Sequence, residues 1–135
     1  MRLARLLAAL SVVAALLLGC KPAFDITLAS AQEQRPNPAF VTAEREAPGA
    51  RPRYNTVKVY DAETKALIWH LRATPFGDEA SQASLRYGVT PDGFAAMIQA
   101  EPLRPGHGYV LVVSGLADGQ LRFEVNAEGG VRAVE

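Results

Sequence analysis

The chain has 135 residues, of which 49 % are hydrophobic and 21 % charged, as expected for one globular domain and not for a disordered chain. Its 14 Lys and Arg balance its 14 Asp and Glu. No excess of positive charge is available to neutralise phosphates, so nucleic-acid binding is not expected. Cys20 is the only cysteine, which rules out an internal disulfide. We therefore expect a domain held together by its apolar core.

The first residues have the parts of an export signal. Met1–Arg5 is short and basic, and Leu6–Leu18 is a run of Leu, Ala and Val interrupted by Ser11. This pattern predicts a signal peptide over residues 1–19. As a helix the apolar run would span about 20 Å, short of the roughly 30 Å hydrocarbon core, so a permanent transmembrane helix is the weaker interpretation.

The apolar run ends in Leu17-Leu18-Gly19-Cys20, which resembles the lipobox of bacterial lipoproteins. The resemblance implies cleavage between Gly19 and Cys20, diacylglycerol on the Cys20 thiol, and an acylated amino terminus. Several acyl chains would anchor the protein to the membrane without spanning it. Lys21 is not the Asp that retains enterobacterial lipoproteins in the inner membrane, so the resemblance also implies an outer-membrane location facing the periplasm. The alternative is a chance cysteine after a conventional cleavage site.

Residues 20–53 are predicted to be a lipid-anchored, proline-rich tether. Two pieces of it have β-strand character. Residues 24–28 alternate apolar and polar side chains, and Phe40-Val41-Thr42 is apolar and β-prone. For each piece an edge strand of the domain is favoured over free linker.

The globular domain is predicted to cover residues 54–135. Its first two strand candidates, 55–60 and 67–72, alternate apolar and polar residues on either side of a connection at 61–65. This pattern predicts a hairpin, although the connection lacks Gly. Trp69, the only tryptophan, lies in the middle of the second candidate and is expected to be buried in the core, as in immunoglobulin-like sandwiches. A partly exposed Trp69 used for binding is the alternative.

Further strand candidates follow at regular spacing. Ser84–Val89 is a short strand candidate, and Thr90-Pro91-Asp92-Gly93 is a strong turn signal. Phe94–Ala100 fits either a strand or one turn of helix, and we expect strand E of a sandwich. Leu121–Val125 alternates like a strand with one wet face. Because it follows a hairpin turn at residues 117–119, it is expected to pair with the preceding strand as strands F and G.

The stretch Pro102–Gly115 combines a tight turn with the most apolar strand of the chain. Pro105-Gly106 suits the centre of a turn because Pro presets φ and Gly accepts positive φ. The strand that begins at Tyr109 is apolar on both faces, which predicts a central strand. The spacing Leu103-x-Pro105-Gly106-x-x-Tyr109 resembles the tyrosine corner of immunoglobulin-like and fibronectin type III domains. The resemblance implies a hydrogen bond from Tyr109 to the upstream backbone; an ordinary loop with a half-buried Tyr109 is the alternative.

About seven strand candidates, and no stretch with convincing helical periodicity, predict an all-β fold. We expect a single immunoglobulin-like antiparallel β-sandwich, preceded by the signal peptide and tether. The pattern also resembles a group of small proteobacterial lipoproteins with an immunoglobulin-like fold, a resemblance that implies no function. The residues that carry it are Tyr87-Gly88, Pro91, Gly93-Phe94, Pro102-Leu103, Pro105-Gly106, Tyr109 and Phe123.

The sequence contains no pattern typical of a catalytic, metal or cofactor site. His70 and His107 have no partner at ligand spacing, so both are expected to face solvent and no metal site is expected. No Gly-x-Ser-x-Gly motif is present. Ser114, His107 and Asp118 cannot form a triad, because Ser114 and His107 lie at opposite ends of one predicted strand, about 20 Å apart. We expect no cofactor and no enzymatic activity.

Two functional hypotheses remain. In the first, the protein is a non-catalytic cell-envelope lipoprotein whose sandwich presents loops or a sheet edge to a protein or glycan partner. In the second, it is a periplasmic carrier or chaperone-like module that binds a small apolar ligand between the sheets. The first predicts a tightly packed core and a polar edge, and the second predicts a cavity or an exposed apolar groove.

Overall fold

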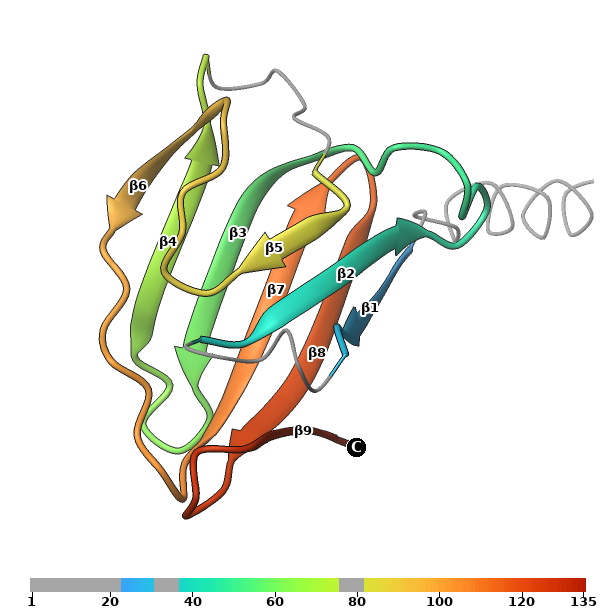
Figure 1. The fold of residues 1–135 in the computed structure, drawn as a ribbon. Coiled ribbons are helices and arrows are strands. Elements are labelled where there is room, and N and C mark those ends of the chain that lie inside the picture. Colours follow the sequence, from blue (N-terminus) through green and yellow to red (C-terminus); the bar gives the residue numbers. More distant parts are fainter. Residues whose placement is uncertain (1–22, 31–36, 76–81) are drawn as a thin grey trace, which may run out of the picture.

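The computed structural model describes residues 23–30, 37–75 and 82–135 (Figure 1). Gly19, Cys20 and the rest of the predicted leader lie outside these residues. The described part contains nine strands and no helix, arranged as two antiparallel sheets that make an all-β sandwich. It therefore has no helix long and apolar enough to cross a membrane.

The larger sheet has six strands in the order β6-β4-β3-β7-β8-β9. Its strands are β3 (Tyr54–Asp61), β4 (Leu67–Ala73), β6 (Phe94–Ile98), β7 (Gly108–Gly115), β8 (Asp118–Val125) and β9 (Val131–Val134). The predicted hairpin is the antiparallel pair β3–β4, and the predicted F–G pair is β7–β8. β7 lies between β3 and β8 and is therefore a central strand, as predicted. Tyr109, Leu111 and Val113 are buried in the core, whereas Val110 and Val112 on the other face are half-buried.

The smaller sheet has three strands, β1 (Phe24–Leu28), β2 (Ala39–Glu44) and β5 (Ser84–Arg86), in the order β1-β2-β5. Figure 1 shows it packed across one face of the larger sheet. β1 is an edge strand as expected, whereas β2 pairs on both sides and is the central strand of this sheet. Both strands lie in the predicted tether, so the sandwich includes residues on the amino-terminal side of residue 54.

The region Phe94–Ala100 contains a strand, β6, but it is not strand E. Strand E of an immunoglobulin-like sandwich belongs to the sheet that contains strands A and B. β6 instead pairs with β4 at the edge of the larger sheet, and β5 occupies the place beside β2. The local pattern predicted the extended conformation of β6 but not its sheet, because its pairing partner is distant in the chain.

The β3–β4 connection turns without glycine because Lys65 takes the left-handed conformation, with φ of 64°. The Lys65 N–H donates to the Asp61 carbonyl at 2.9 Å, and the Asp61 N–H donates to the Ala66 carbonyl at 2.9 Å. A non-glycine residue at positive φ carries a conformational cost. The hydrogen bonds of the connection offset that cost.

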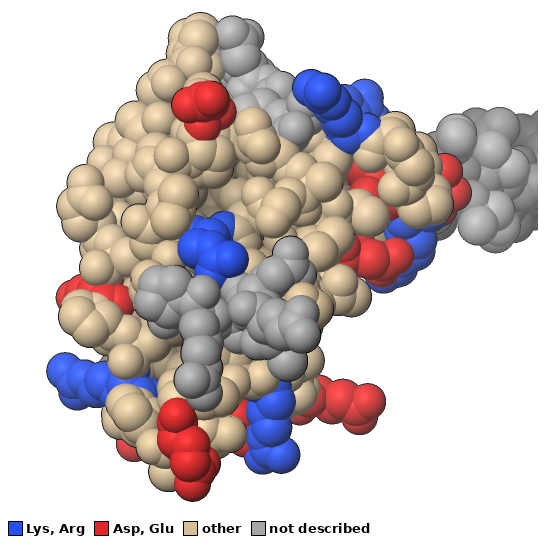
Figure 2. Space-filling view, in the orientation of Figure 1, with Lys and Arg blue, Asp and Glu red and all other residues tan. Residues whose placement is uncertain are grey.

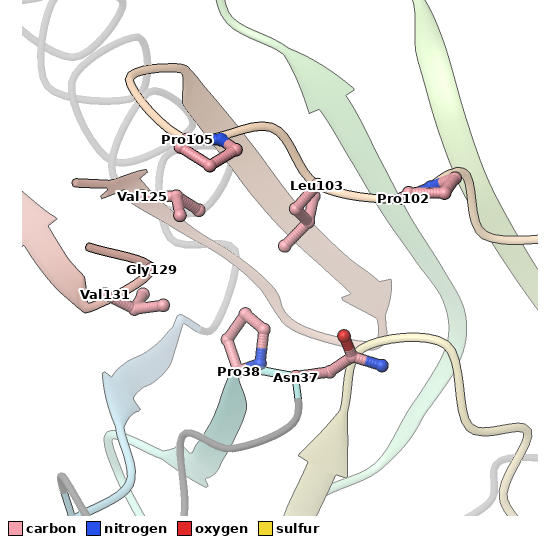
Figure 3. Close-up of a pocket in the computed structure, with 8 residues that line it drawn as sticks. All are labelled: Asn37, Pro38, Pro102, Leu103, Pro105, Val125, Gly129 and Val131. Carbon is pink, nitrogen blue, oxygen red and sulfur yellow. The ribbon is translucent and has the colours of Figure 1, made fainter. Parts of the chain in front are cut away.

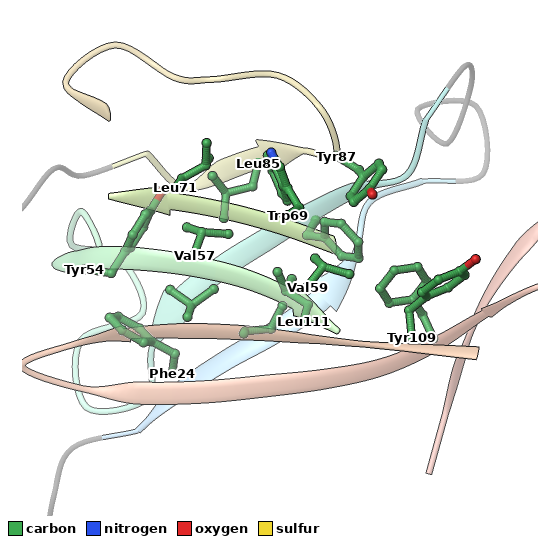
Figure 4. Packing of buried hydrophobic residues seen from close by; sticks show 14 of the residues in the cluster. Phe24, Tyr54, Val57, Val59, Trp69, Leu71, Leu85, Tyr87, Tyr109 and Leu111 are labelled. Carbon is green, nitrogen blue, oxygen red and sulfur yellow. The ribbon is translucent and has the colours of Figure 1, made fainter. Parts of the chain in front are cut away.

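Aromatic rings join the two sheets through the core (Figure 4). Trp69 in β4 is only 1 % exposed, and its ring lies 5.1 Å from that of Tyr87, which follows β5. Two more pairs cross between the sheets in the same way. They are Phe40–Phe123 at 5.2 Å and Phe24–Tyr54 at 6.1 Å. Such pairs contribute about 0.5–1.5 kcal/mol each beyond the burial of their apolar area.

Gly119 allows β1 to cross closely over β8. A Cβ atom at Gly119 would lie 2.7 Å from the Cβ of Phe24 and 2.8 Å from the Phe24 carbonyl oxygen. Both distances are shorter than van der Waals contact. Only glycine therefore fits at this position of β8 without moving β1.

Candidate interaction surface

Tyr109 stands at the start of β7, and its hydroxyl accepts a hydrogen bond from the Arg104 N–H at 2.8 Å. Between these residues, the His107 N–H donates to the Arg104 carbonyl at 3.3 Å, and Gly106 has φ of 80°. Pro105 and Gly106 thus occupy the central positions of a type II turn. Leu103 is partly buried against the core. The structure brings together all four residues of the predicted corner.

A second tyrosine holds the same segment of chain. The Tyr87 hydroxyl donates to the Glu101 carbonyl at 2.5 Å, so residues 101–104 are bonded by tyrosines from two separate parts of the fold. Burial removes the Tyr87 phenolate from water and raises the pKa of this hydroxyl. Sequence reasoning did not identify this role, because nothing near Tyr87 in the chain marks its partner.

The corner segment forms one wall of a hollow of about 210 Å³, which we call the corner notch (Figure 3). It is lined by Asn37, Pro38, Pro102, Leu103, Pro105, Val125, Gly129 and Val131. Pro38 immediately precedes β2 of the smaller sheet, whereas Val125 and Val131 belong to the larger sheet. The notch therefore lies between the two sheets at one end of the sandwich. Apart from Asn37, its lining side chains are apolar.

Two more hollows adjoin the corner segment. One, of about 310 Å³, shares Asn37 and Pro102 with the corner notch and extends to Tyr87 and Gln99. The other, of about 140 Å³, lies between the corner segment and the β3–β4 connection, where Asp61 forms part of its lining. These two hollows are lined in part by polar side chains, such as Asp61, Gln99 and Glu101, whereas the lining of the corner notch is mostly apolar.

Asp61 gives this end of the sandwich a well-fixed negative charge. Its carboxylate accepts hydrogen bonds from the backbone N–H groups of Thr64 at 3.0 Å and Glu63 at 2.8 Å. These bonds, with that from Thr64 as the larger cause, lower the pKa of the Asp61 carboxyl below its ordinary value. His107 lies nearby, with its Nδ1 atom 4.0 Å from Asp61 Oδ2. Asp61 therefore places a negative charge beside the corner segment at neutral pH.

Both histidines are half-buried and neither belongs to the buried core. His70 lies on β4, where burial, with smaller contributions from Lys58 and Arg72, lowers its pKa. Ser114 lies near the end of β7 and His107 just before its start, so the strand separates them. Within the described ranges, no group of three or more His, Cys, Asp and Glu residues is placed to hold a metal ion.

We compared the chain with protein-family models, with curated proteins and with solved structures, and none of the three comparisons found a match. Any conclusion about function therefore depends on the residues and the fold described above.

Proposed function

We propose that the protein is a non-catalytic lipoprotein of the bacterial cell envelope that binds a protein or glycan partner. The corner notch is the observation that carries this proposal. It is apolar, solvent-open and bordered by polar groups such as Asn37, Glu101 and Asp61. An apolar centre with a polar rim is the usual anatomy of a recognition surface.

The walls of the notch are rigid before any partner arrives. Pro38, Pro102 and Pro105 restrict the backbone on two sides, and the hydroxyls of Tyr87 and Tyr109 hold the segment between them. A preformed surface loses little conformational entropy on binding. A corner fixed in this way presents the notch to a partner without rearrangement.

The order of the strands supports a likeness to immunoglobulin-like and fibronectin type III domains. β1, β2 and β5 lie in the order of strands A, B and E, and β4, β3, β7 and β8 lie in the order of C′, C, F and G. β6 and β9 are then additions at the edges of the larger sheet. Tyr109 would start strand F, which is where the tyrosine corner occurs. Sandwiches of this kind are common in cell-surface recognition, although the fold alone does not specify a partner.

The Leu17–Cys20 motif supports attachment of acyl chains to Cys20 and, with Lys21, an outer-membrane location facing the periplasm. Replacing Cys20 by Ala should abolish both acylation and membrane anchoring. Metabolic palmitate labelling of the full chain measures this directly. Label retained on the Cys20→Ala protein would remove the lipoprotein assignment.

Partner binding is tested by photo-crosslinking in intact envelopes, using the full chain. A photoreactive side chain at exposed Pro105, on the rim of the notch, should capture a partner that the same group at Gly49 does not. Gly49 is also exposed and lies in the β2–β3 connection, away from the corner. Adding Val131→Trp should fill the notch and abolish capture. Ala133→Trp, on the same strand but outside the notch lining, should not. Equal capture at Pro105 and Gly49 would contradict the proposal.

The second candidate function, a carrier of a small apolar ligand, is favoured only by the position of the notch between the sheets. Its volume of about 210 Å³ is below the roughly 300–1,000 Å³ of typical small-molecule pockets. A solvatochromic dye separates the two functions. Stoichiometric dye binding that Val131→Trp abolishes and Ala133→Trp leaves unchanged would favour the carrier.

A further inference from the structure

We propose that the free edge of β6 binds an extended segment of a partner polypeptide as an additional strand, and that this segment is apolar in its centre and basic at its ends. No residue of β6 lines the corner notch, although Glu101 lies close to both surfaces, so the proposal goes beyond the function proposed above. It depends on a comparison of the sheet edges, on side-chain exposure and on charge.

Four strands in the described part have a neighbouring strand on one side only: β1 and β5 in the smaller sheet, β6 and β9 in the larger. Proteins usually protect such edges with charged residues, because an open row of N–H and C=O groups is a template for another chain. β1 carries Asp25, β5 carries Arg86 and β9 carries Arg132. β6, with the sequence Phe-Ala-Ala-Met-Ile, carries no charge.

The side chains of β6 are also unusually apolar for their exposure. Met97 is 52 % exposed and Ile98 is 37 % exposed. An irregularity opposite His70 and Leu71 leaves Met97 as an extra residue between the positions that pair with β4. A bulge of this kind interrupts an edge and limits the length over which a new strand can pair. We therefore expect a short occupant, of about the length of β6, which is about 17 Å at 3.3–3.4 Å per residue.

Carboxylates lie on either side of this uncharged edge. Asp92 precedes β6 and Glu101 follows it, and both are exposed. Neither forms an ion pair with another residue of the described part. Figure 2 shows the surface at the left of the view, where Figure 1 places β6, as an uncharged area with an acidic side chain near each end.

This charge pattern selects among occupants. A partner strand with Lys or Arg at both ends would complement Asp92 and Glu101. A second copy of this chain, paired antiparallel through its own β6, would instead bring Asp92 of one copy to the Glu101 end of the other. Like charges so placed disfavour the pairing. The occupant is therefore a segment of a different polypeptide.

The test uses the full chain and a synthetic peptide of alternating Thr and Val with Lys at each end. Its binding is measured by fluorescence anisotropy at low salt. The wild type and Leu116→Lys should bind it, whereas Met97→Lys should bind about tenfold or more weakly, because a lysine at the edge blocks strand addition. Leu116 is a matched control, since it is 54 % exposed and lies in the β7–β8 connection. Val131→Trp should leave peptide binding unchanged, which separates this site from the corner notch.

Two variants of the peptide, a Pro twin and a Glu twin that each differ from it only at the stated positions, test the chemistry of the bound segment. A peptide with Pro at its centre should not bind, because Pro cannot donate to the ladder. A peptide with Glu at both ends should bind more weakly than the Lys form, and the double variant Asp92→Lys/Glu101→Lys should reverse that preference. Independently of any variant, the peptide should slow hydrogen exchange of the β6 amides in the wild type.

Three results would overturn the proposal. They are equal affinities of Met97→Lys and Leu116→Lys for the Lys peptide, equal binding of the Pro twin, and unchanged exchange of the β6 amides. A wild-type dimer in sedimentation that Met97→Lys converts to a monomer would also overturn it, by making a second copy the occupant.

Discussion

The two sheets of the sandwich differ in width and in the contacts on which they depend. In the larger sheet, β3–β4, β7–β8 and β8–β9 each pair with the next strand along the chain. In the smaller sheet, β5 pairs with β2 although β3 and β4 lie between them in sequence. The smaller sheet is joined to the larger by the aromatic pairs that cross the core and by an ion pair, in which Arg53 Nη2 lies 3.0 Å from the buried Glu44 carboxylate. Both sheets thus combine pairs of consecutive strands with pairs of strands that are distant in the chain, such as β3–β7 in the larger sheet. The smaller sheet has only three strands, so it depends more on side chains that reach across the interior.

The contacts across the core are therefore the points at which the packing of the two sheets is most easily weakened. Loss of a cross-core side chain should release the smaller sheet before the larger one. Changes within a hairpin should instead alter the stability of the larger sheet with little effect on how the two sheets pack. Native-state hydrogen exchange can distinguish these outcomes, because it reports the opening of each strand separately.

The largest effect is expected for Trp69→Ala. Truncation removes the ring that contacts Tyr87, the residue that follows β5, and leaves a cavity in a fully buried site. It should therefore lower the free energy of unfolding by about 3–5 kcal/mol. Urea denaturation measures the loss, and exchange at β5 should accelerate before exchange at β3 and β7. A loss below about 1 kcal/mol would show that the core tolerates the cavity, and would contradict the dependence of the smaller sheet on side chains that cross the core.

Tyr109 separates packing from hydrogen bonding within the larger sheet. Tyr109→Ala should cost about 3–5 kcal/mol, because it removes a buried ring that stacks on Phe123. Tyr109→Phe removes only the hydroxyl that accepts from the Arg104 N–H, and should cost about 1–3 kcal/mol. Both are measured by urea denaturation. A neutral Tyr109→Phe would mean that the hydroxyl contributes nothing to the corner.

Gly119→Ala tests the contact between β1 and β8. The new Cβ would meet Phe24 at 2.7 Å, so β1 must move, and we expect a cost of about 1–3 kcal/mol. Exchange in β1 and β2 should accelerate more than exchange in β3. Gly49→Ala is the control, because a Cβ there has nothing within 4 Å. Similar stabilities for the two variants would show that β1 does not depend on close approach to β8.

The smallest effect is expected in a hairpin of the larger sheet. Lys65→Gly should stabilise the protein by about 0.5–1 kcal/mol, because the relief of a left-handed lysine exceeds the added freedom of glycine in the unfolded chain. Lys65→Ala retains the unfavourable φ and should not stabilise. Urea midpoints of the two variants provide the comparison. The ratio of hydrogen-exchange rates between the smaller and the larger sheet should be the same in these variants as in the wild type. A change of exchange confined to the smaller sheet would contradict a local role for this hairpin.

Features that depend on near neighbours in the chain could be predicted from the sequence alone. Alternation of apolar and polar residues marked β3, β4 and β8, because the two faces of a strand differ at every second residue, and a continuous apolar run marked β7. Pro105-Gly106 and Tyr109 marked the turn and its hydrogen bond, since the interacting groups lie within a few residues. The burial of Trp69 followed from its position on the apolar face of its strand.

The grouping of strands into sheets, and the surfaces that result from it, became visible only in the folded protein. β2 is a central strand because it also pairs with β5, which lies far away in the chain, and β6 is an edge because β4 is its only neighbour among the described strands. A strand carries no local sign of which partner it will have. The hydrogen bond from Tyr87 to Glu101 and the corner notch depend in the same way on distant segments meeting. Local periodicity specifies which face of a strand is buried, whereas the choice of neighbour depends on packing summed over the whole core.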